Sequence, residues 1–328
     1  MRFIFRHFSC ALRAFHRVLR ISPLPDGGLF SFSSLISRLA IGLSLLSLIW
    51  MPVACRPRQA NPVDGASAAA RTIENKGSDT LVNLALAWAE AYMGRYPDVR
   101  ISVTGGGSGT GIAALINGTV DLANASRAMK PEEVAAAEAN GISPVEFTVA
   151  RDAIAVVVHP SNPVDRLTLR QISDIYTGKI TNWSQVGGQD RPIVLLSRES
   201  NSGTYVYLLE NVIRLGDKES DLLFSPDTLL MPSSEGISAE VRQNPNSIGY
   251  DGLGYVTADQ KVVAVARDVD GPYVLPSVET VNDDSYPISR PLYVYTAGEP
   301  TGAVEEYLKW ILDEGQTLVS ELGFVPLR

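Results

Sequence analysis

The sequence predicts an α/β protein in which helices pack against largely parallel sheets, and two patterns carry this prediction. Apolar residues recur with helical spacing between Leu81 and Tyr92, and Pro97 follows just beyond that segment. Apolar, β-branched runs at 145–150 and 153–159 are typical of strands. Because segments of the two kinds alternate along the chain, layers of helix and sheet are expected.

The remaining segments are assigned in chain order by the same patterns. We expect strands at 100–104, 120–123, 192–196 and 290–296, and helices at 112–116, from Pro131, at 168–176, through 205–212 and at 303–318. The predicted connections are a Gly-rich loop at 105–111, a proline-containing crossover at 159–168, a turn at 182–188, and a Gly-punctuated strand with a return crossing at 247–256.

Length and charge limit the classes of protein that need to be considered. A chain of 328 residues is typical of about two domains, and its composition of 45% hydrophobic and 20% charged residues is ordinary for a globular protein. Residues 1–55 carry six basic side chains and one acidic, so the other 273 residues carry 22 basic and 35 acidic groups, a net charge of −13. Such a body repels nucleic acid, and any bound anion must be held by local hydrogen-bond donors.

Cysteine and histidine are too scarce for most metal and nucleophile chemistry. After removal of a leader through residue 54, the chain keeps only Cys55 and His159. A zinc site of the Cys/His type needs three or four such ligands and a disulfide needs two cysteines, so neither is expected. We predict no metal and no cofactor, and a Ser-His-Asp arrangement would depend on His159 alone.

An apolar segment near the N-terminus predicts export. Residues 39–54 carry no charge and follow Arg38, but these sixteen residues are fewer than the ~20 of a membrane-spanning helix. A basic stretch, a short apolar core and a small residue before the cleavage point are typical of a secretory signal, with a retained membrane anchor as the alternative. Residues 56–71 are rich in Pro, Ala and Ser and are predicted to be a flexible tether.

The residues before Cys55 resemble a bacterial lipobox. Pro-Val-Ala precedes this cysteine, although Pro52 stands where leucine is usual. The resemblance implies that Cys55 is lipidated and becomes the mature N-terminus. Ordinary cleavage nearby is the alternative.

Three segments share a design that suits an anion: 76–80, 105–111 and 200–204. Each places Gly, Ser and Thr between a strand and a helix start, where unpaired N–H groups carry a partial positive charge. Plain helix caps are the alternative for any single segment. Arg127 and Arg198 lie at predicted strand ends beside helix starts, and the guanidinium fork suits phosphate oxygens. Together these features favour a site for a tetrahedral oxyanion.

The same stretches disfavour nucleotide and nucleophile chemistry. The chain has no G-x-x-x-x-G-K-[ST] loop. A relaxed G-x-G-x-x-A match at 109–114 lies inside a Gly-rich run, without the acidic residue expected after the following strand. Ser108 and Ser202 have no neighbouring base, so a hydrolase is not favoured.

Seven motifs, in a fixed order, resemble a known family: GSDTL, W-x-x-x-Y-x-x-x-Y-P, ISVTGGGSGTGI, GTVDLANASRAM, LTLRQISDIYTGKITNW, SRESNSGT and SIGYDGLGYV. Over residues 74–325 the chain is similar to the periplasmic phosphate-binding proteins of Pst-type ABC importers. The resemblance implies a two-lobe periplasmic-binding-protein fold of type II. Each lobe is then a mixed sheet flanked by helices, and the ligand lies in the interlobe cleft.

The resemblance also implies a domain organisation. The chain is expected to cross between the lobes near 152–160 and again near 250–258. The expected parts are a leader at 1–55, a tether at 56–71, a first lobe of 72–152 plus 258–328, and a second lobe of 153–257.

Ligand positions of the family are carried over motif by motif. In the first lobe, Thr80 matches a hydroxyl ligand, Leu81 a backbone N–H ligand and Ser108 the hydroxyl of the Gly-rich loop, with Ser78 as an adjacent candidate. The matches in the second lobe are Arg198, Ser202, Gly203 and Thr204.

One departure from the family concerns the proton of phosphate. Some members have an aspartate, which accepts this proton, at the position of Arg127, so Arg127 is expected to be a charge partner instead. The residue that accepts the phosphate proton, and so distinguishes phosphate from sulfate, is then unassigned. Asp79 is the candidate, with a helix cap as its alternative role and Glu199 as the next choice.

The resemblance implies a secreted, lipid-anchored, monomeric binding protein in the periplasm or on the outer face of the cell membrane. It would capture inorganic phosphate and deliver it to an ABC permease and its ATPase, without catalysis. A second hypothesis keeps the fold and changes the anion to sulfate or molybdate, and a third is a phosphate-binding sensor or adhesin without a transporter. A site with a proton acceptor favours phosphate, and neighbouring transporter genes would exclude the sensor.

Overall fold

The computed structural model describes residues 71–327, which belong to one compact unit. The predicted leader, the tether up to residue 70 and Cys55 lie outside the described residues. Within 71–327 no helix has both the length and the apolar character that a membrane crossing requires. The same residues contain no group of three or more His, Cys, Asp or Glu side chains that could hold a metal ion.

Strands and helices alternate along most of the chain, as the sequence predicted. The strands are β1 (Arg71–Gly77), β2 (Val99–Thr104), β3 (Leu122–Ala125), β4 (Val145–Val158), β5 (Arg166–Thr168), β6 (Val194–Arg198), β7 (Leu229–Met231), β8 (Ser247–Gly252), β9 (Lys261–Ala266) and β10 (Ser289–Thr296). The helices are α1 (Asp79–Arg95), α2 (Ser108–Ile116), α3 (Pro131–Ala139), α4 (Leu169–Tyr176), α5 (Gly203–Leu208), α6 (Ser234–Gln243), α7 (Val278–Asn282), α8 (Gly302–Leu312) and α9 (Gln316–Glu321). Short turns are η1 (Trp183–Val186), η2 (Leu209–Ile213) and η3 (Leu253–Tyr255).

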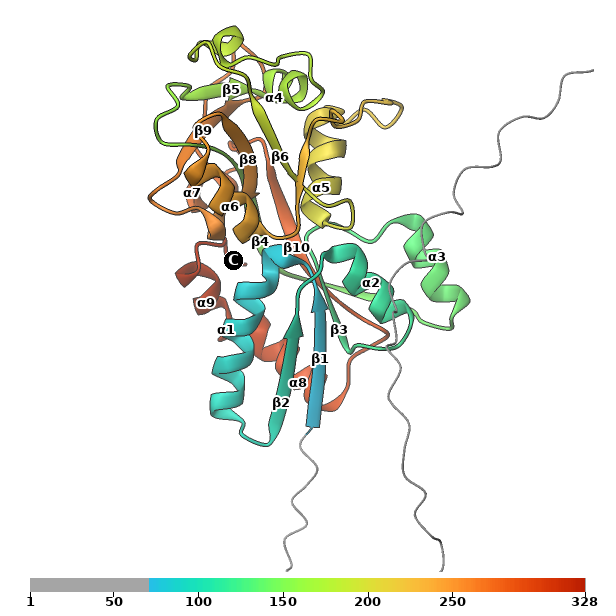
Figure 1. Cartoon of the computed structure of the whole chain (residues 1–328). Helices are drawn as coiled ribbons and strands as arrows, with labels where there is room; N and C mark the ends of the chain where they lie inside the picture. Colours follow the sequence, from blue (N-terminus) through green and yellow to red (C-terminus); the bar gives the residue numbers. More distant parts are fainter. Residues whose placement is uncertain (1–70, 328) are drawn as a thin grey trace, which may run out of the picture. The chain divides into compact units, whose positions relative to one another are not determined.

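The strands form a mixed sheet with the order β2-β1-β3-β10-β4-β8-β6-β7, and β9 pairs with β4 and β5. β1 is parallel to β2 and β3, whereas β4 is antiparallel to β10 and β8. In Figure 1, β1, β2, α1 and α8 gather in the lower half and β5, β6, β8 and α4 in the upper half. The two-lobe α/β fold is therefore confirmed, and antiparallel pairs around β4 replace the largely parallel sheet that the alternation alone predicted.

Each half of the molecule has its own apolar core. The first core combines β1, α1, β10 and α8 through side chains such as Ile73, Leu84, Trp88, Val294 and Leu308. The second core is built on the C-terminal part of β4 together with α4, β6, β8 and β9. Two separate cores mean that the halves can move relative to each other without exposing either core.

Residues 258–288 pack with the second core, whereas the sequence placed them in the first lobe. The chain reaches the first core at Tyr255 and then turns back. Val263 and Val265 of β9 and Val281 of α7 belong to the second core. The physical reason is backbone pairing. β9 pairs with residues 156–158 of β4 and with β5, and neither of these segments reaches the first half.

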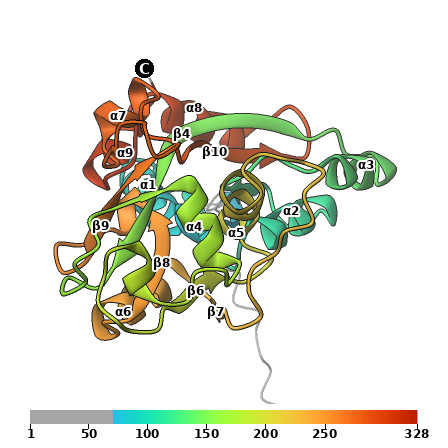
Figure 2. The ribbon, with the colours of Figure 1, turned by 90° about the horizontal axis from the view of Figure 1, so that it is seen from above.

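Strand β4 joins the two halves as one continuous element, and Figure 2 draws it as a long strand. The sequence patterns predicted two runs separated by Arg151 and Asp152 and a proline-containing crossover at 159–168, whereas the family resemblance placed the crossing between lobes near 152–160. In the structure residues 145–153 pair with β10 and residues 154–158 pair with β8, so the crossing lies inside the strand. The two charged residues do not interrupt it because each has an ionic partner, Asp284 for Arg151 and Arg290 for Asp152.

The predicted C-terminal helix at 303–318 is two helices, α8 and α9. The break lies at Asp313–Gly315, where a Cβ on Gly315 would come within 2.9 Å of Ile311 Cα. The Trp88 indole donates to the Gly315 carbonyl at 2.8 Å, which fixes the break against α1.

Three chain segments pass between the halves and meet at Asp152. Its carboxylate accepts from the backbone N–H of Leu253 at 3.0 Å and from Arg290 Nη2 at 3.0 Å. A third contact joins β4 to the residue before β10, since Ile154 N donates to the Ile288 carbonyl at 2.8 Å. Asp152 has no exposed surface, so the junction is a buried polar hinge.

Candidate anion-binding site

The three segments predicted from sequence do meet in space, at the N-termini of α1, α2 and α5. The Gly109 N–H at the start of α2 donates to the Asn201 carbonyl before α5 at 2.9 Å. Thr80 Oγ1 of α1 lies 2.9 Å from Thr204 Oγ1 of α5. Helix starts from both halves therefore converge at one point, with their partial positive charges directed inward.

Buried hydroxyls line this convergence. Ser108 Oγ accepts from the backbone N–H of Ser126 at 3.0 Å and lies 3.3 Å from Ser126 Oγ. Ser78, Thr80, Ser108, Ser202 and Thr204 are all buried. Ser126 was not predicted from sequence, although it precedes Arg127 directly in the NASRAM motif. Two predicted groups have local partners, because Ser202 Oγ accepts from Thr204 N and Leu81 N donates to the Ser78 carbonyl.

Glycine permits the close approach of the two halves. Gly107 adopts φ +90°, and a Cβ there would lie 2.8 Å from the Asn201 carbonyl oxygen. Gly203 is the first residue of α5, and a Cβ there would lie 2.6 Å from Ser126 Oγ and 3.0 Å from Ser108 Cβ. Only residues without a side chain allow this contact.

Arg198 and Asp79 form an ion pair across the two halves. Arg198 Nη2 donates to Asp79 Oδ2 at 2.6 Å, and Nη1 donates to Ser234 Oγ at 3.2 Å. The other carboxylate oxygen of Asp79 accepts from Gly106 N at 2.9 Å. Both oxygens of Asp79 are thus engaged, one by the second-half arginine and one by the Gly-rich loop. Glu199, the next candidate acceptor, is exposed.

Arg127 has a carboxylate partner of its own. Its two terminal nitrogens donate to Glu133 at 2.7 and 2.6 Å, and Glu133 also caps α3 through Lys130 N at 2.8 Å. Burial would raise the pKa of Glu133, but the hydrogen bonds and charge of Arg127 outweigh it and lower that pKa. Arg127 lies beside α2, since a Cβ on Gly109 would be 3.8 Å from Arg127 Nη2.

Arg290 is the functional candidate that the sequence prediction missed. It is 2% exposed, and its Nη2 lies 3.0 Å from Thr204 Oγ1 and 3.3 Å from Thr80 Oγ1. The same guanidinium donates to the Ser126 carbonyl at 3.1 Å and to Asp152 at 3.0 Å. Burial raises the pKa of Asp152, and the charge of Arg290 opposes that shift. Arg290 therefore connects the hydroxyl cluster to the hinge.

A signal for Arg290 was present in the sequence. Asp152 interrupts one of the most apolar strands, and Arg290 opens another. Charged residues are rarely buried unless they are paired, so two opposite charges in buried strands predict a pair. Which two would meet is not readable from sequence, because residues 152 and 290 are far apart in the chain.

The arrangement can bind an anion with several oxygens. Hydroxyls of Thr80, Ser108, Ser126 and Thr204 can each donate or accept, and Arg290 donates only. Three arginines near the helix starts, Arg127, Arg198 and Arg290, each have one carboxylate partner. The pairs are locally neutral, so an incoming anion is held by directed donors and not by net charge.

Asp251 is a buried carboxyl close enough to Arg198 to be influenced by its charge. It has no ionic partner among the described residues. It accepts from Gly252 N at 3.0 Å and, weakly, from Ser238 Oγ at 3.4 Å. Burial raises the pKa of Asp251 to about 7, against hydrogen bonding and the charge of Arg198, which lower it. The folded protein therefore keeps this proton up to about pH 7, whereas the unfolded chain releases it near pH 3.8.

The titration of Asp251 predicts a loss of stability as pH rises. Between pH 4 and 7 the folded state holds one proton more than the unfolded state, so the free energy of unfolding falls by on the order of 4 kcal/mol across that window. In Asp251→Asn this slope should be absent, and the variant should be the more stable protein at pH 8. Urea unfolding at pH 5 and pH 8 measures both. An equal decline in the two proteins would assign the slope to another group.

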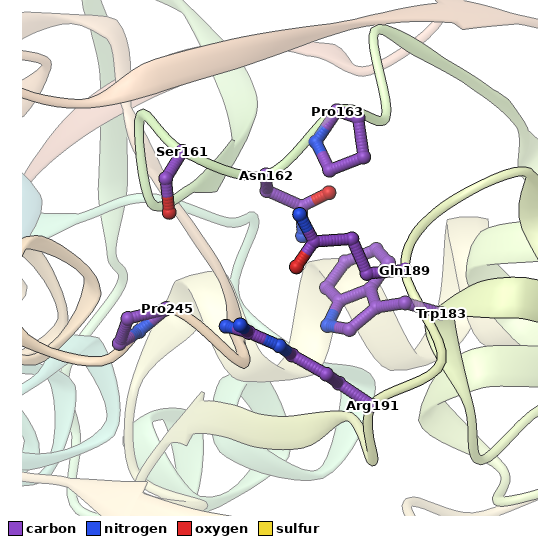
Figure 3. Close-up of a pocket in the computed structure, with 7 residues that line it drawn as sticks. All are labelled: Ser161, Asn162, Pro163, Trp183, Gln189, Arg191 and Pro245. Atoms are coloured by element: carbon purple, nitrogen blue, oxygen red, sulfur yellow. The ribbon is translucent and has the colours of Figure 1, made fainter.

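A small cavity elsewhere in the second half is unrelated to this site (Figure 3). It has a volume of about 10 Å³, enough for one water molecule. The Asn162 amide nitrogen beside it is buried without a partner among residues 71–327. None of the residues that line it was predicted to bind a ligand.

Comparison with known proteins places the chain in a family. The profile of the PBP superfamily domain matches residues 62–314. The chain belongs to this superfamily. Phosphate-binding protein PstS of Pseudomonas aeruginosa is 35% identical over 280 residues, which cover 80% of this chain and 85% of that protein. Phosphate-binding protein PstS of Bacillus subtilis is 29% identical over 302 residues, covering 89% of this chain and 94% of its own.

Solved structures of superfamily members share the architecture. A phosphate ABC transporter substrate-binding protein from Clostridium perfringens, solved with bound phosphate, has 35% identity and a TM-score of 0.70. The alignment covers 79% of this chain and 100% of the Clostridium perfringens chain. An ABC-type phosphate transport receptor from Vibrio cholerae has 28% identity and a TM-score of 0.63, over 78% of this chain and all of the receptor.

Proposed function

We propose that this protein captures inorganic phosphate outside the cytoplasm and delivers it to an ABC permease. One observation carries the proposal: both lobes contribute to a group of buried hydroxyls, in which Thr80 and Thr204 contact the guanidinium of Arg290 and Ser108 contacts Ser126. Such a cluster offers directed donors to several oxygens of one anion. The relatives named phosphate-binding proteins support phosphate as that anion.

The proposed ligand set keeps the predicted residues and adds two. Phosphate would be held by Ser78, Asp79, Thr80, Leu81, Ser108, Arg127, Arg198, Ser202, Gly203 and Thr204, together with Ser126 and Arg290. Within this set Asp79 and Arg127 act through their ionic partners, Arg198 and Glu133.

The two lobes are proposed to divide at the hinge around Asp152. Residues 72–152 and 289–328 would form the first lobe and residues 153–288 the second. This division follows the two apolar cores except at Tyr255, which packs in the first core, and Val325, which packs in the second. Lobe opening would then release the contacts between Thr80 and Thr204 and between Gly109 and Asn201.

Calorimetric titration of residues 72–328 tests the function. Phosphate should bind in a one-to-one complex, and sulfate should bind more weakly. Absence of phosphate binding would refute the proposal, and tighter sulfate binding would favour the sulfate alternative. We propose that the protein catalyses no reaction, so incubation with p-nitrophenyl phosphate should release no nitrophenol.

Asp79→Asn tests how the site distinguishes anions. Both carboxylate oxygens already accept hydrogen bonds, so we expect the change to loosen Arg198 and to weaken phosphate and sulfate alike, by about tenfold. Titrations with each anion measure the two affinities. If the ratio between them narrows instead, Asp79 accepts the phosphate proton. Glu132→Gln removes a charge from an exposed position of α3 and serves as the control.

The N-terminal residues are proposed to anchor the protein to a membrane through lipidated Cys55. Cys55→Ser should convert a detergent-extractable protein into one found in the soluble fraction, because serine cannot carry the lipid chain. A multiply acylated terminus holds a protein firmly to a membrane, whereas one lipid chain holds it only marginally. Phase partitioning of the full chain measures this. Retention of Cys55→Ser in the membrane would favour an uncleaved apolar segment.

The partner is proposed to be an ABC permease with its ATPase, and the binding protein is proposed to act as a monomer. Co-purification with the permease encoded nearby would support the assignment. If no permease or ATPase gene lies near the gene for this protein, the sensor or adhesin alternative would be favoured.

A further inference from the structure

A cavity of about 460 Å³ lies beside the hydroxyl cluster, between the lobes. Residues 127–131 and 290–293 line it from the first lobe, and residues between 206 and 218 line it from the second. Small-molecule sites in proteins have volumes of about 300–1,000 Å³, so the cavity has the size of an organic ligand and not of inorganic phosphate alone.

The cavity adjoins the proposed phosphate site and shares Arg127 and Arg290 with it. Arg290 forms part of its wall, but the guanidinium already contacts Thr80, Thr204 and Asp152 on the other side. Arg127 forms another part of the wall and lies against the start of α2. Two arginines thus stand between the hydroxyl cluster and the cavity.

The charged side chains of the wall are mostly basic. Arg127, Lys130, Lys218 and Arg290 line the cavity, against one acid, Glu210. Lys218 makes no ion pair with any residue in 71–327, and Lys130 makes a long one with Glu132, at 4.0 Å. In a body with a net charge of −13, one unpaired and one loosely paired lysine at a cavity are a local attraction for an anion.

One buried donor in the wall lacks a partner. Arg127 is 9% exposed, and its Nε makes no hydrogen bond among the described residues, although both terminal nitrogens bind Glu133. This N–H has almost no accessible surface, so a ligand in the cavity could reach it only if the Arg127 side chain moved.

The remaining wall is apolar and aromatic. Tyr207 is held in place because its hydroxyl donates to the Ser289 carbonyl at 2.7 Å and Arg290 Cζ lies 5.7 Å from its ring centre. Tyr293, Val206 and Pro291 complete this surface. Rings that are fixed before binding suit a flat apolar body.

We propose that this cavity is a second binding site, which takes a small organic anion with a flat apolar body while phosphate occupies the first. The two lysines would meet the anionic group, and Tyr207 and Tyr293 would pack against the body. This proposal depends on the proposed function in one respect: it takes phosphate as the ligand of the first site. Because Arg290 and Arg127 adjoin both sites, occupancy of one changes the affinity of the other, reciprocally.

Titration of phosphate-saturated protein with phenyl phosphate, benzoate and benzyl alcohol tests the proposal. The two anions should bind, and the neutral alcohol of similar size should bind at least about tenfold more weakly. Lys130→Gln combined with Lys218→Gln should weaken both anions about tenfold, and Glu210→Gln should strengthen them. Lys179→Gln removes one positive charge just after α4, at a residue that does not line the cavity, and should alter nothing.

Two results would overturn the second site: no binding of either anion to saturated protein, or binding that rising phosphate abolishes, which would place the probe in the first site. Phosphate affinity of the double lysine variant, measured in parallel, should stay unchanged. Failure of phosphate itself to bind would refute the proposed function and would leave the titration of the cavity as a separate result.

Discussion

Arg290→Met is expected to remove phosphate binding and to lower the free energy of unfolding by about 3–5 kcal/mol. Asp152 has no exposed surface, and Arg290 is its only ionic partner among the described residues. Loss of the arginine leaves a carboxylate buried without compensation. It also removes the guanidinium that we propose donates to phosphate beside Thr80 and Thr204, and two charge-assisted hydrogen bonds to the anion would correspond to at least about a hundredfold in affinity.

A double variant separates these two effects. Arg290→Met together with Asp152→Asn removes both buried charges, and replacing a whole buried pair is often close to neutral for stability. We expect urea unfolding to show most of the lost stability restored, while calorimetry shows phosphate affinity still reduced. If the double variant binds phosphate like the original protein, Arg290 belongs to the hinge and not to the ligand set.

Gly203→Ala is expected to hold the lobes apart and to weaken phosphate binding at least about a hundredfold, because the second-lobe donors no longer reach the anion. The new Cβ would lie 2.6 Å from Ser126 Oγ and 3.0 Å from Ser108 Cβ. A methyl group attached to the backbone cannot rotate away from these atoms. Each lobe has its own core, so opening relieves the clash and the protein stays folded.

Small-angle scattering and calorimetry together measure this outcome. In phosphate, Gly203→Ala should keep a larger radius of gyration than the original protein. Gly298→Ala is the matched control, since a Cβ at Gly298 meets nothing within 4 Å. A compact Gly203→Ala protein with ordinary affinity would show that the observed approach of the lobes is not needed for binding.

Local patterns were sufficient for most elements of the fold. Helical spacing predicted the core of α1, and the Gly/Ser/Thr segments marked the starts of α1, α2 and α5. These features depend on neighbouring residues, through side-chain periodicity and the need to cap free N–H groups. β5, β7, β9, α6 and α7 were not predicted, and the π-helical turn η2 was taken as ordinary helix.

By itself, the sequence determined the fold class, the family and the three Gly/Ser/Thr segments that converge in the structure, because each is encoded within a few consecutive residues. Only the tertiary structure decided which charges meet. Asp79 engages Arg198, and Asp152 engages Arg290, over separations of 119 and 138 residues. Burial makes such pairing obligatory, since an isolated charge in the interior is costly, but it does not choose the partner. The route of the chain makes that choice, by bringing β4 and β10 side by side beneath the hydroxyl cluster.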